Sequence, residues 1–340
     1  MERKGAAAQI RRCKEGESER TDMKTKPTAE DVFEQAKEQA LDAKLKSIFN
    51  IMDAAAIFEE LPPPFYLVPK LRMGPGRPSM IAGYGGAGKT IAAQSLALSV
   101  ATGRDVWTSE DGKQKFDKTV TTKVLHLDRD QGSGRARRQY HRLAKGMGIT
   151  KEELQGRLYL SSFPNLTFAN DRMEWAEHLE ALVSRYKEGE HGPLVIFDAF
   201  VGFLGELEEN STEAAKPLYK LGEISERTGA TFLMLHHARK GGKDEKDTKL
   251  SIRGSSAIFG AIDMAIILEA EKDIGPGVCR VIHEKSPTMK FGEIHVQITS
   301  SPSKNGEDDN GPLYCRMIQD PTAPKSKHKE SKSIERLVVR

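Results

Sequence analysis

The sequence predicts an α/β fold, a mostly parallel sheet flanked by helices, with an antiparallel edge near the C-terminus. From Phe65 onward, short apolar runs alternate with longer amphipathic stretches, a rhythm typical of parallel strands joined by helices. After Leu268 the helical stretches disappear and two strand-like runs follow each other directly. This change favours an antiparallel hairpin at the sheet edge.

The individual elements follow from the spacing of apolar residues, which is continuous in buried strands and recurs every three to four residues in helices. Strands are expected at Ser79–Ala82, Val124–Leu127, Leu158–Ser161, Leu194–Phe197, Thr231–Leu235, Ile262–Leu268, Cys279–Glu284 and Gly292–Thr299. Helices are expected at Lys89–Ala101, Arg135–Gly146, Arg172–Tyr186 and Ala214–Thr228.

Composition divides the chain into four segments. Residues 1–27 are charged throughout and are expected to be disordered. Residues 28–64 form a helical extension that ends in a proline-rich linker, because Thr28 and Asp31 resemble a capping box and three prolines follow at positions 62–64. Residues 65–300 hold the α/β domain, and residues 301–340 are expected to be a flexible basic tail.

Bulk composition excludes several classes of protein. The 340 residues carry a net charge of only +3, which argues against a surface coated with nucleic acid, although local basic patches can still matter. The three cysteines, Cys13, Cys279 and Cys315, lie far apart, so neither a disulfide framework nor a structural zinc site is expected. No apolar run approaches the ~20 residues that cross a bilayer, and we expect a cytoplasmic protein without a membrane partner.

One glycine-rich segment carries the chemistry of a phosphate site. Residues 83–90 fit the pattern G-x-x-x-x-G-K-[ST], in which backbone N–H groups and a helix N-terminus surround an anion. Lys89 is expected to bridge the β- and γ-phosphates of ATP, and the Thr90 hydroxyl to ligate Mg²⁺. The alternative is a plain glycine turn. The expected ATP-binding residues are Gly83, Tyr84, Gly85, Gly86, Ala87, Gly88, Lys89 and Thr90.

Two later strands end in acidic residues. The buried-strand pattern that ends at Asp198 matches the Walker B arrangement, so Asp198 is expected to hold Mg²⁺ together with Thr90. The strand that begins at Val124 ends in Asp128 and Asp130, either of which can polarise the attacking water. The alternative is that both acids only solubilise a strand end.

These motifs resemble the RecA-like ATPases, and most closely the RepA-type hexameric replicative helicases of plasmids and phages. The resemblance covers Leu67 to Val296 and includes the segments 67–71, 85–90 and 208–211. Its most specific parts are Leu-His-His-Ala-Arg-Lys-Gly at 235–241 and Ile-Arg-Gly-Ser-Ser-Ala at 252–257.

The resemblance implies roles for further residues. His237 matches a polar sensor of the γ-phosphate, and Arg253 matches the arginine finger that reaches a neighbouring active site. Lys285 matches a second trans-acting basic residue more loosely. Asp130 stands where the family carries a glutamate, and its side chain is one methylene shorter. For His237 the alternative is a structural histidine, and for Arg253 a solvated loop arginine.

The resemblance also implies partners. They are other copies of the same chain in a ring, typically a hexamer, together with single-stranded DNA and replication proteins. Lysines at 243, 246 and 249 are candidates to pair with DNA phosphates, and a solvated loop explains them nearly as well. A basic stripe at Arg138, Arg142 and Lys145 is expected to face DNA, a neighbouring subunit or water. A regulatory, assembly-switch ATPase and an ATP-binding DNA accessory protein remain the alternative functions.

Overall fold

The computed structural model describes residues 28–49, 54–169, 174–238, 256–302 and 310–318. Contacts divide the chain into two units, Met1–Pro63 and Pro64–Arg340. In the first unit, α1 (Ala29–Phe49) begins after Thr28, whose carbonyl accepts a hydrogen bond from the Val32 amide at 3.0 Å. A short second helix, α2 (Ala54–Ile57), follows. Among the described residues, no helix is both long and apolar enough to span a bilayer.

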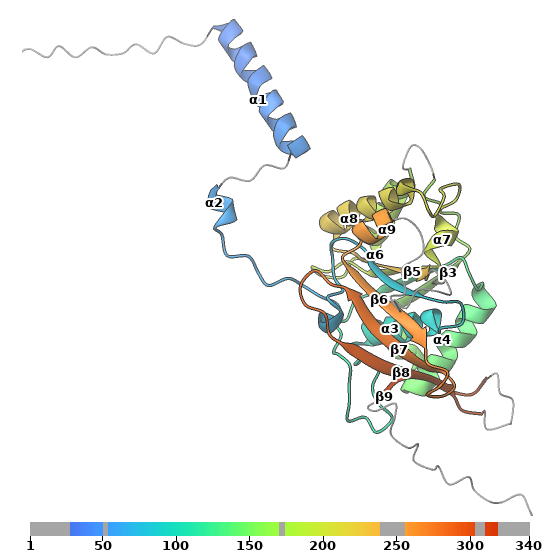
Figure 1. Cartoon of the computed structure of the whole chain (residues 1–340). Helices are drawn as coiled ribbons and strands as arrows, with labels where there is room; N and C mark the ends of the chain where they lie inside the picture. Colours follow the sequence, from blue (N-terminus) through green and yellow to red (C-terminus); the bar gives the residue numbers. More distant parts are fainter. Residues whose placement is uncertain (1–27, 50–53, 170–173, 239–255, 303–309, 319–340) are drawn as a thin grey trace, which may run out of the picture. The chain divides into compact units, whose positions relative to one another are not determined.

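The second unit is built on one sheet, in which the described strands run in the order β3-β2-β4-β5-β1-β6-β7-β8-β9. Figure 1 shows its last part, from β6 through β7 and β8 to β9. The parallel strands are β1 (Ser79–Gly83), β2 (Val124–Asp128), β3 (Leu158–Ser162), β4 (Leu194–Asp198), β5 (Thr231–His237) and β6 (Met264–Ala270). The antiparallel strands are β7 (Val278–Lys285), β8 (Glu293–Ser300) and β9 (Leu313–Ile318). The predicted fold class, a mostly parallel sheet with an antiparallel C-terminal edge, is confirmed.

Helices cover both faces of the sheet because its central strands are apolar on both sides. One face packs against α3 (Lys89–Thr102), α4 (Ser133–Met147) and α5 (Lys151–Leu154). The other packs against α6 (Glu174–Tyr186), α7 (Phe200–Phe203) and α8 (Lys216–Thr228) and against α9 (Ser256–Gly260). Two 3₁₀ turns, η1 (Pro69–Leu71) and η2 (Thr212–Ala215), complete the described elements. Side chains alternate between the two faces along β1. Ile81 therefore lies in the core on the α3 side of the sheet (the first core), and Met80 in the core on the α8 side (the second core).

Strand order sets where the chemistry can occur. β5 lies between β1 and β4, so the glycine-rich segment after β1 and the acid at the end of β4 are separated by one strand. Because all these strands are parallel, their carboxyl ends lie along one edge, where ligands bind in open α/β sheets. Register places Gly83 beside His237, and Asp128 beside Asp198.

The sheet continues further than the sequence analysis expected. Residues 313–318 were expected to belong to a flexible tail, but they form β9, which pairs antiparallel with β8. Leu313 and Cys315 are buried in the first core, which explains why this polar-flanked segment is ordered. The flexible tail prediction is therefore wrong for these six residues, and residues 303–309 and 319–340 lie outside the described part of the chain.

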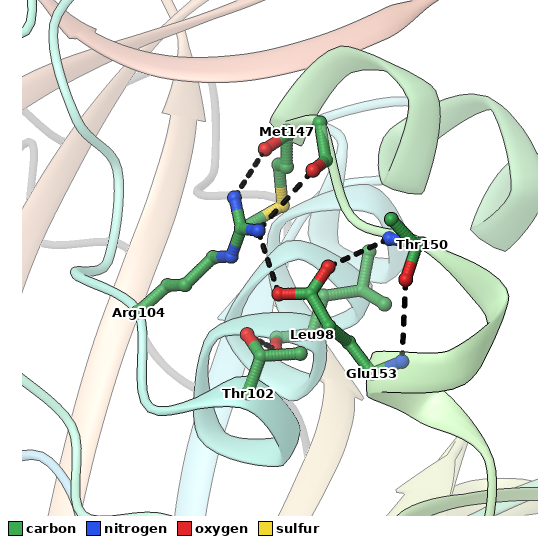
Figure 2. Close-up of polar contacts among 7 residues, drawn as sticks. Leu98, Thr102, Arg104, Met147, Thr150 and Glu153 are labelled. Atoms are coloured by element: carbon green, nitrogen blue, oxygen red, sulfur yellow. Dashed lines mark hydrogen bonds and ion pairs between the residues drawn. The ribbon is translucent and has the colours of Figure 1, made fainter.

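The far end of α3 is fixed by one arginine (Figure 2). Arg104 donates hydrogen bonds to the carbonyl oxygens of Met147, at 2.6 Å, and Gly148, at 3.2 Å. The same guanidinium pairs with Glu153 at 2.8 Å, and Glu153 also closes a capping box with Thr150. These bonds tie the segment after α3 to the end of α4 and to α5.

Candidate nucleotide site

The glycine-rich segment forms a tight loop between β1 and α3. Gly86 and Gly88 both have a φ of +80°, a conformation that L side chains rarely adopt, and the Ala87 amide donates to the Tyr84 carbonyl at 3.2 Å. A Cβ atom on Gly83 would lie 2.5 Å from the Leu268 carbonyl oxygen, so the start of the loop tolerates only glycine. The loop therefore has the backbone of a phosphate-binding loop at a helix N-terminus.

Lys89 points back into this loop. Its ammonium group donates hydrogen bonds of 2.9 Å to the carbonyl oxygens of Gly83 and Tyr84. Burial lowers the pKa of Lys89, and the carboxylates of Asp198 and Asp130 oppose part of that shift. The lysine is thus held by the loop carbonyls with both predicted acids within electrostatic range, and a triphosphate would replace the two carbonyl partners.

Asp198 ends β4 and is 2% exposed. Thr90, at the first turn of α3, is half-buried. The two residues offer a hydroxyl and a carboxylate oxygen, the hard ligands that Mg²⁺ prefers, and Mg²⁺ is usually held by one or two such groups together with phosphate oxygens. These side chains fit the metal, and no described cluster of three or more His, Cys, Asp or Glu residues offers another metal site.

The two acids after β2 have different surroundings. Asp128 accepts hydrogen bonds from three consecutive backbone amides, those of Asp130, Gln131 and Gly132, at 2.8 to 3.0 Å. Its carboxylate also accepts a longer bond from the Ser162 hydroxyl. Asp130, by contrast, is exposed. Asp128 therefore holds the loop before α4, and both acids remain predictions as groups that polarise water.

The sensor position adjoins the phosphate loop. His237 is half-buried at the end of β5, directly beside Gly83 in the parallel register. The next amide, that of Ala238, donates to the Gly83 carbonyl at 3.0 Å. The chain that follows, including Arg253 and the lysines at 243, 246 and 249, lies outside the described residues.

Three other basic residues make contacts within their own chain. The ammonium group of Lys285 donates to the Phe259 carbonyl at 2.6 Å and lies over the Phe259 ring. On α4, Arg142 donates to the Gly311 carbonyl at 2.8 Å, and Lys145 to the Asn310 carbonyl at 3.3 Å. Arg142 and Lys145 therefore hold the segment before β9, a role that the helical spacing alone did not indicate.

The antiparallel edge supports the loop from behind. The Cys279 thiol on β7 donates to the Ala87 carbonyl at 3.3 Å, and burial raises the pKa of this thiol. A Cβ atom on Gly88 would lie 2.3 Å from Cδ1 of Ile298 on β8. Neither contact was predictable from the sequence, because the residues are about 190 and 210 positions apart and share no motif.

Two comparisons relate this chain to known proteins. A protein-family model described as an AAA domain matches residues 42–243, which include the phosphate loop, Asp130, Asp198 and His237. Among solved structures, the crystal structure of the RadB recombinase matches with a TM-score of 0.48 and 14% identity, over 73% of this chain and 93% of that one. The family match covers more than half of the chain, and the chain therefore belongs to the AAA-domain family.

Proposed function

We propose that this protein hydrolyses ATP and uses the cycle as a ring-forming motor on single-stranded DNA, in the manner of RepA-type replicative helicases. The observation that carries the ATPase part is the convergence on Lys89. This buried lysine lies in the glycine loop and within electrostatic range of both Asp198 and Asp130. Nucleotide binding, metal binding and water activation thus have candidate groups at one edge of the sheet.

Each group has a separate task in hydrolysis. The loop amides and Lys89 bind the phosphates, with the ammonium group exchanging the Gly83 and Tyr84 carbonyls for phosphate oxygens. Thr90 and Asp198 hold Mg²⁺, which when bound neutralises charge on the β- and γ-phosphates. Asp130 orients the attacking water. These tasks use residues of the loop and of α3 together with acids that follow the carboxyl ends of β4 and β2.

Ring formation rests on the resemblance. In the proposal, Arg253 of a neighbouring subunit stabilises the charge that develops on the γ-phosphate, and the lysines at 243, 246 and 249 contact DNA phosphates. The bond from the Ala238 amide to the Gly83 carbonyl supports this coupling, because it joins the start of that segment to the phosphate loop. A change of the loop on hydrolysis then reaches the segment directly.

A second function, an assembly-switch ATPase without unwinding activity, is favoured by the acids after β2. Asp130 has a shorter side chain than the glutamate of the helicases, and the carboxylate of Asp128 is committed to three loop amides. Slow hydrolysis suits a protein in which bound nucleotide only controls assembly. If hydrolysis is slower still, the protein would be an accessory protein that binds ATP and DNA without useful turnover.

A subunit-mixing experiment tests the trans-acting arginine. Arg253→Ala and Lys89→Ala are each expected to abolish hydrolysis, the first with nucleotide binding retained. In an equimolar mixture, an intact loop of one variant meets the intact Arg253 of the other, so partial recovery of hydrolysis is expected. If ATP hydrolysis does not recover although sedimentation shows that both variants assemble, the proposed ring is contradicted. Separation of a forked DNA duplex by the wild-type chain then distinguishes the motor from the switch.

A further inference from the structure

A buried histidine lies behind Asp198. His126 is 0% exposed in the middle of β2, on the sheet face that packs against α4. Alternation places Asp198 on the same face of the adjacent strand β4, diagonal to His126, which pairs with Ile196. His126 Nε2 lies 3.5 Å from Asp198 Oδ2, and neither atom has a hydrogen-bond partner among the described residues. The two atoms are thus left facing each other in the core.

Tyr140 lies where its hydroxyl can fix which imidazole nitrogen of His126 carries the proton. The Tyr140 hydroxyl on α4 lies 2.8 Å from His126 Nδ1, with the two rings edge to face. Burial raises the pKa of Tyr140 well above its ordinary value, and the carboxylates of Asp198 and Asp128 raise it further, so the phenol keeps its proton. If the hydroxyl donates to Nδ1, the imidazole proton is on Nε2 and points at Asp198. The opposite tautomer would place the Nε2 lone pair against a carboxylate.

We propose that Tyr140 and His126 form a positioning relay for Asp198, in which the phenol fixes the imidazole tautomer and the imidazole N–H fixes the carboxylate orientation that Mg²⁺ needs. This inference rests on the proposed function, since it assigns residues to the same metal site. A closure of about 0.5 Å brings Nε2 and Oδ2 to an ordinary hydrogen-bond distance. Hydrogen-bonded neighbours of ligating carboxylates affect metal affinity by roughly 10- to 100-fold.

The alternative interpretation is that His126 only fills the core. The geometry argues against it, because an apolar residue at this position would avoid burying an imidazole nitrogen without a partner, at a cost of about 1 to 3 kcal/mol. The sequence offers the same signal: His126 is the polar residue within the run Val-Leu-His-Leu that precedes Asp128. A core filler predicts no effect on Mg²⁺, and the relay predicts a specific one.

The test compares apolar and hydrogen-bonding replacements in the full chain. The variants are His126→Leu, which removes the donor, His126→Gln, whose side-chain amide can donate from a similar position, and Tyr140→Phe, which removes only the hydroxyl. His283→Leu is the matched control, because His283 is also a buried strand histidine, 3% exposed, on β7. The readout is the affinity for a fluorescent N-methylanthraniloyl-ATP, first in EDTA and then across a Mg²⁺ titration.

The relay predicts a change confined to the metal-dependent part of binding. His126→Leu raises the Mg²⁺ midpoint by about 10-fold or more and leaves the affinity in EDTA unchanged. Tyr140→Phe shifts the midpoint in the same direction, His126→Gln remains within about threefold of the wild type, and His283→Leu leaves the midpoint unchanged. A relay residue of this kind alters the Mg²⁺ dependence, which a merely structural residue does not.

Two outcomes overturn the inference, and they differ from failure of the proposed function. If folded His126→Leu and Tyr140→Phe variants show the wild-type Mg²⁺ midpoint, the relay is wrong while the nucleotide site stands. If His126→Leu does not fold, Tyr140→Phe alone decides, since it deletes one oxygen atom. If the wild-type chain binds no nucleotide with or without Mg²⁺, the proposed function fails and the relay fails with it.

Discussion

The ammonium group of Lys89 donates a 2.9 Å hydrogen bond to the carbonyl oxygen of Gly83, six residues earlier in the chain. Gly83 also accepts a bond from the Ala238 amide and lies beside His237 in the sheet register. Gly83 therefore joins Lys89, the predicted phosphate ligand, to the end of β5, where the predicted sensor His237 lies. Changes in the Lys89 contacts can reach β5 through this single residue.

Substitutions of Asp128 and Asp130 are expected to have different effects, the first on the stability of the fold and the second on ATP hydrolysis. Asp128→Asn weakens the acceptor of three loop amides and is expected to lower the free energy of unfolding by about 1 to 3 kcal/mol. Asp130→Asn changes an exposed side chain, so the free energy of unfolding stays within about 0.5 kcal/mol. ATP hydrolysis by Asp130→Asn is expected to fall by about 100-fold or more. Urea unfolding and steady-state turnover measure both; equal destabilisation by the two variants contradicts the assignment.

Two loop glycines with the same φ of +80° provide a matched pair. Gly86→Ala meets no atom within 4 Å, so it carries only the backbone strain of about 1 kcal/mol. Gly88→Ala carries the same strain and also overlaps Cδ1 of Ile298, at 2.3 Å. Gly88→Ala is therefore expected to be the more destabilising, and adding Ile298→Val, which deletes that methyl group, is expected to restore part of the loss. Chemical denaturation of the four chains measures this, and an Ile298→Val change that gives no recovery argues against the contact.

A second pair of glycines on α4 tests how β9 docks. A Cβ atom on Gly146 would lie 2.1 Å from the Leu313 carbonyl oxygen, whereas one on Gly134 meets nothing within 4 Å. Gly134→Ala is expected to stabilise the chain by up to about 1 kcal/mol through helix propensity. Gly146→Ala is expected to destabilise it, because the backbone of β9 must move. Thermal unfolding distinguishes the two variants. If the melting temperature of Gly146→Ala equals or exceeds that of Gly134→Ala, β9 does not pack against α4 at Gly146.

The buried His283 is expected to lower the free energy of unfolding at acid pH. Burial, with Lys290 nearby, lowers the pKa of His283 from 6.5 to about 4, and the Phe291 amide donates to its Nδ1 at 3.1 Å. The unfolded chain therefore binds a proton that the folded chain excludes between these pH values. Stability is complete above pH 6.5 and falls as the pH decreases toward 4, with a loss of about 2 kcal/mol by pH 5.

The control for this pH dependence is His283→Gln, which cannot titrate and can still accept the Phe291 amide bond through its side-chain oxygen. Denaturant unfolding at pH 7.5 and pH 5 is expected to show a larger loss for the wild type than for the variant. Equal losses in the two chains would mean that other groups cause the acid sensitivity.

The sequence predicted local features of this protein well. The strands β1 to β8 and the helices α3, α4, α6 and α8 lie within a few residues of their expected positions, because each has an apolar run or period of its own. The phosphate-loop motif was recognisable from the fixed spacing of its glycines, lysine and threonine, and Asp198 from the apolar run that it ends. The roles of Lys89, Thr90 and Asp198 in binding nucleotide and metal remain predictions. Asp130, His237 and Arg253 remain predictions as catalytic residues.

Features that depend on distant contacts were not predictable. β9 is flanked by Pro, Asp and Lys residues, and its order comes from pairing with β8 and burial of Leu313. Asp128 and Asp130 look equivalent in the sequence. Only the turn of the backbone after β2 brings the loop amides within hydrogen-bond distance of the Asp128 carboxylate. His126 lies 72 positions before Asp198, and only the pairing of β2 with β4 brings them together.

Steady-state ATP hydrolysis with and without single-stranded DNA tests the central claim most directly, with Lys89→Ala as the blank. The account predicts Mg²⁺-dependent hydrolysis that the blank lacks, and a DNA-dependent increase of about tenfold or more if the protein is a motor. Hydrolysis that ignores DNA supports the assembly switch instead of the helicase. Wild-type turnover no greater than that of Lys89→Ala would contradict the assignment of an ATP-hydrolysing site at this loop.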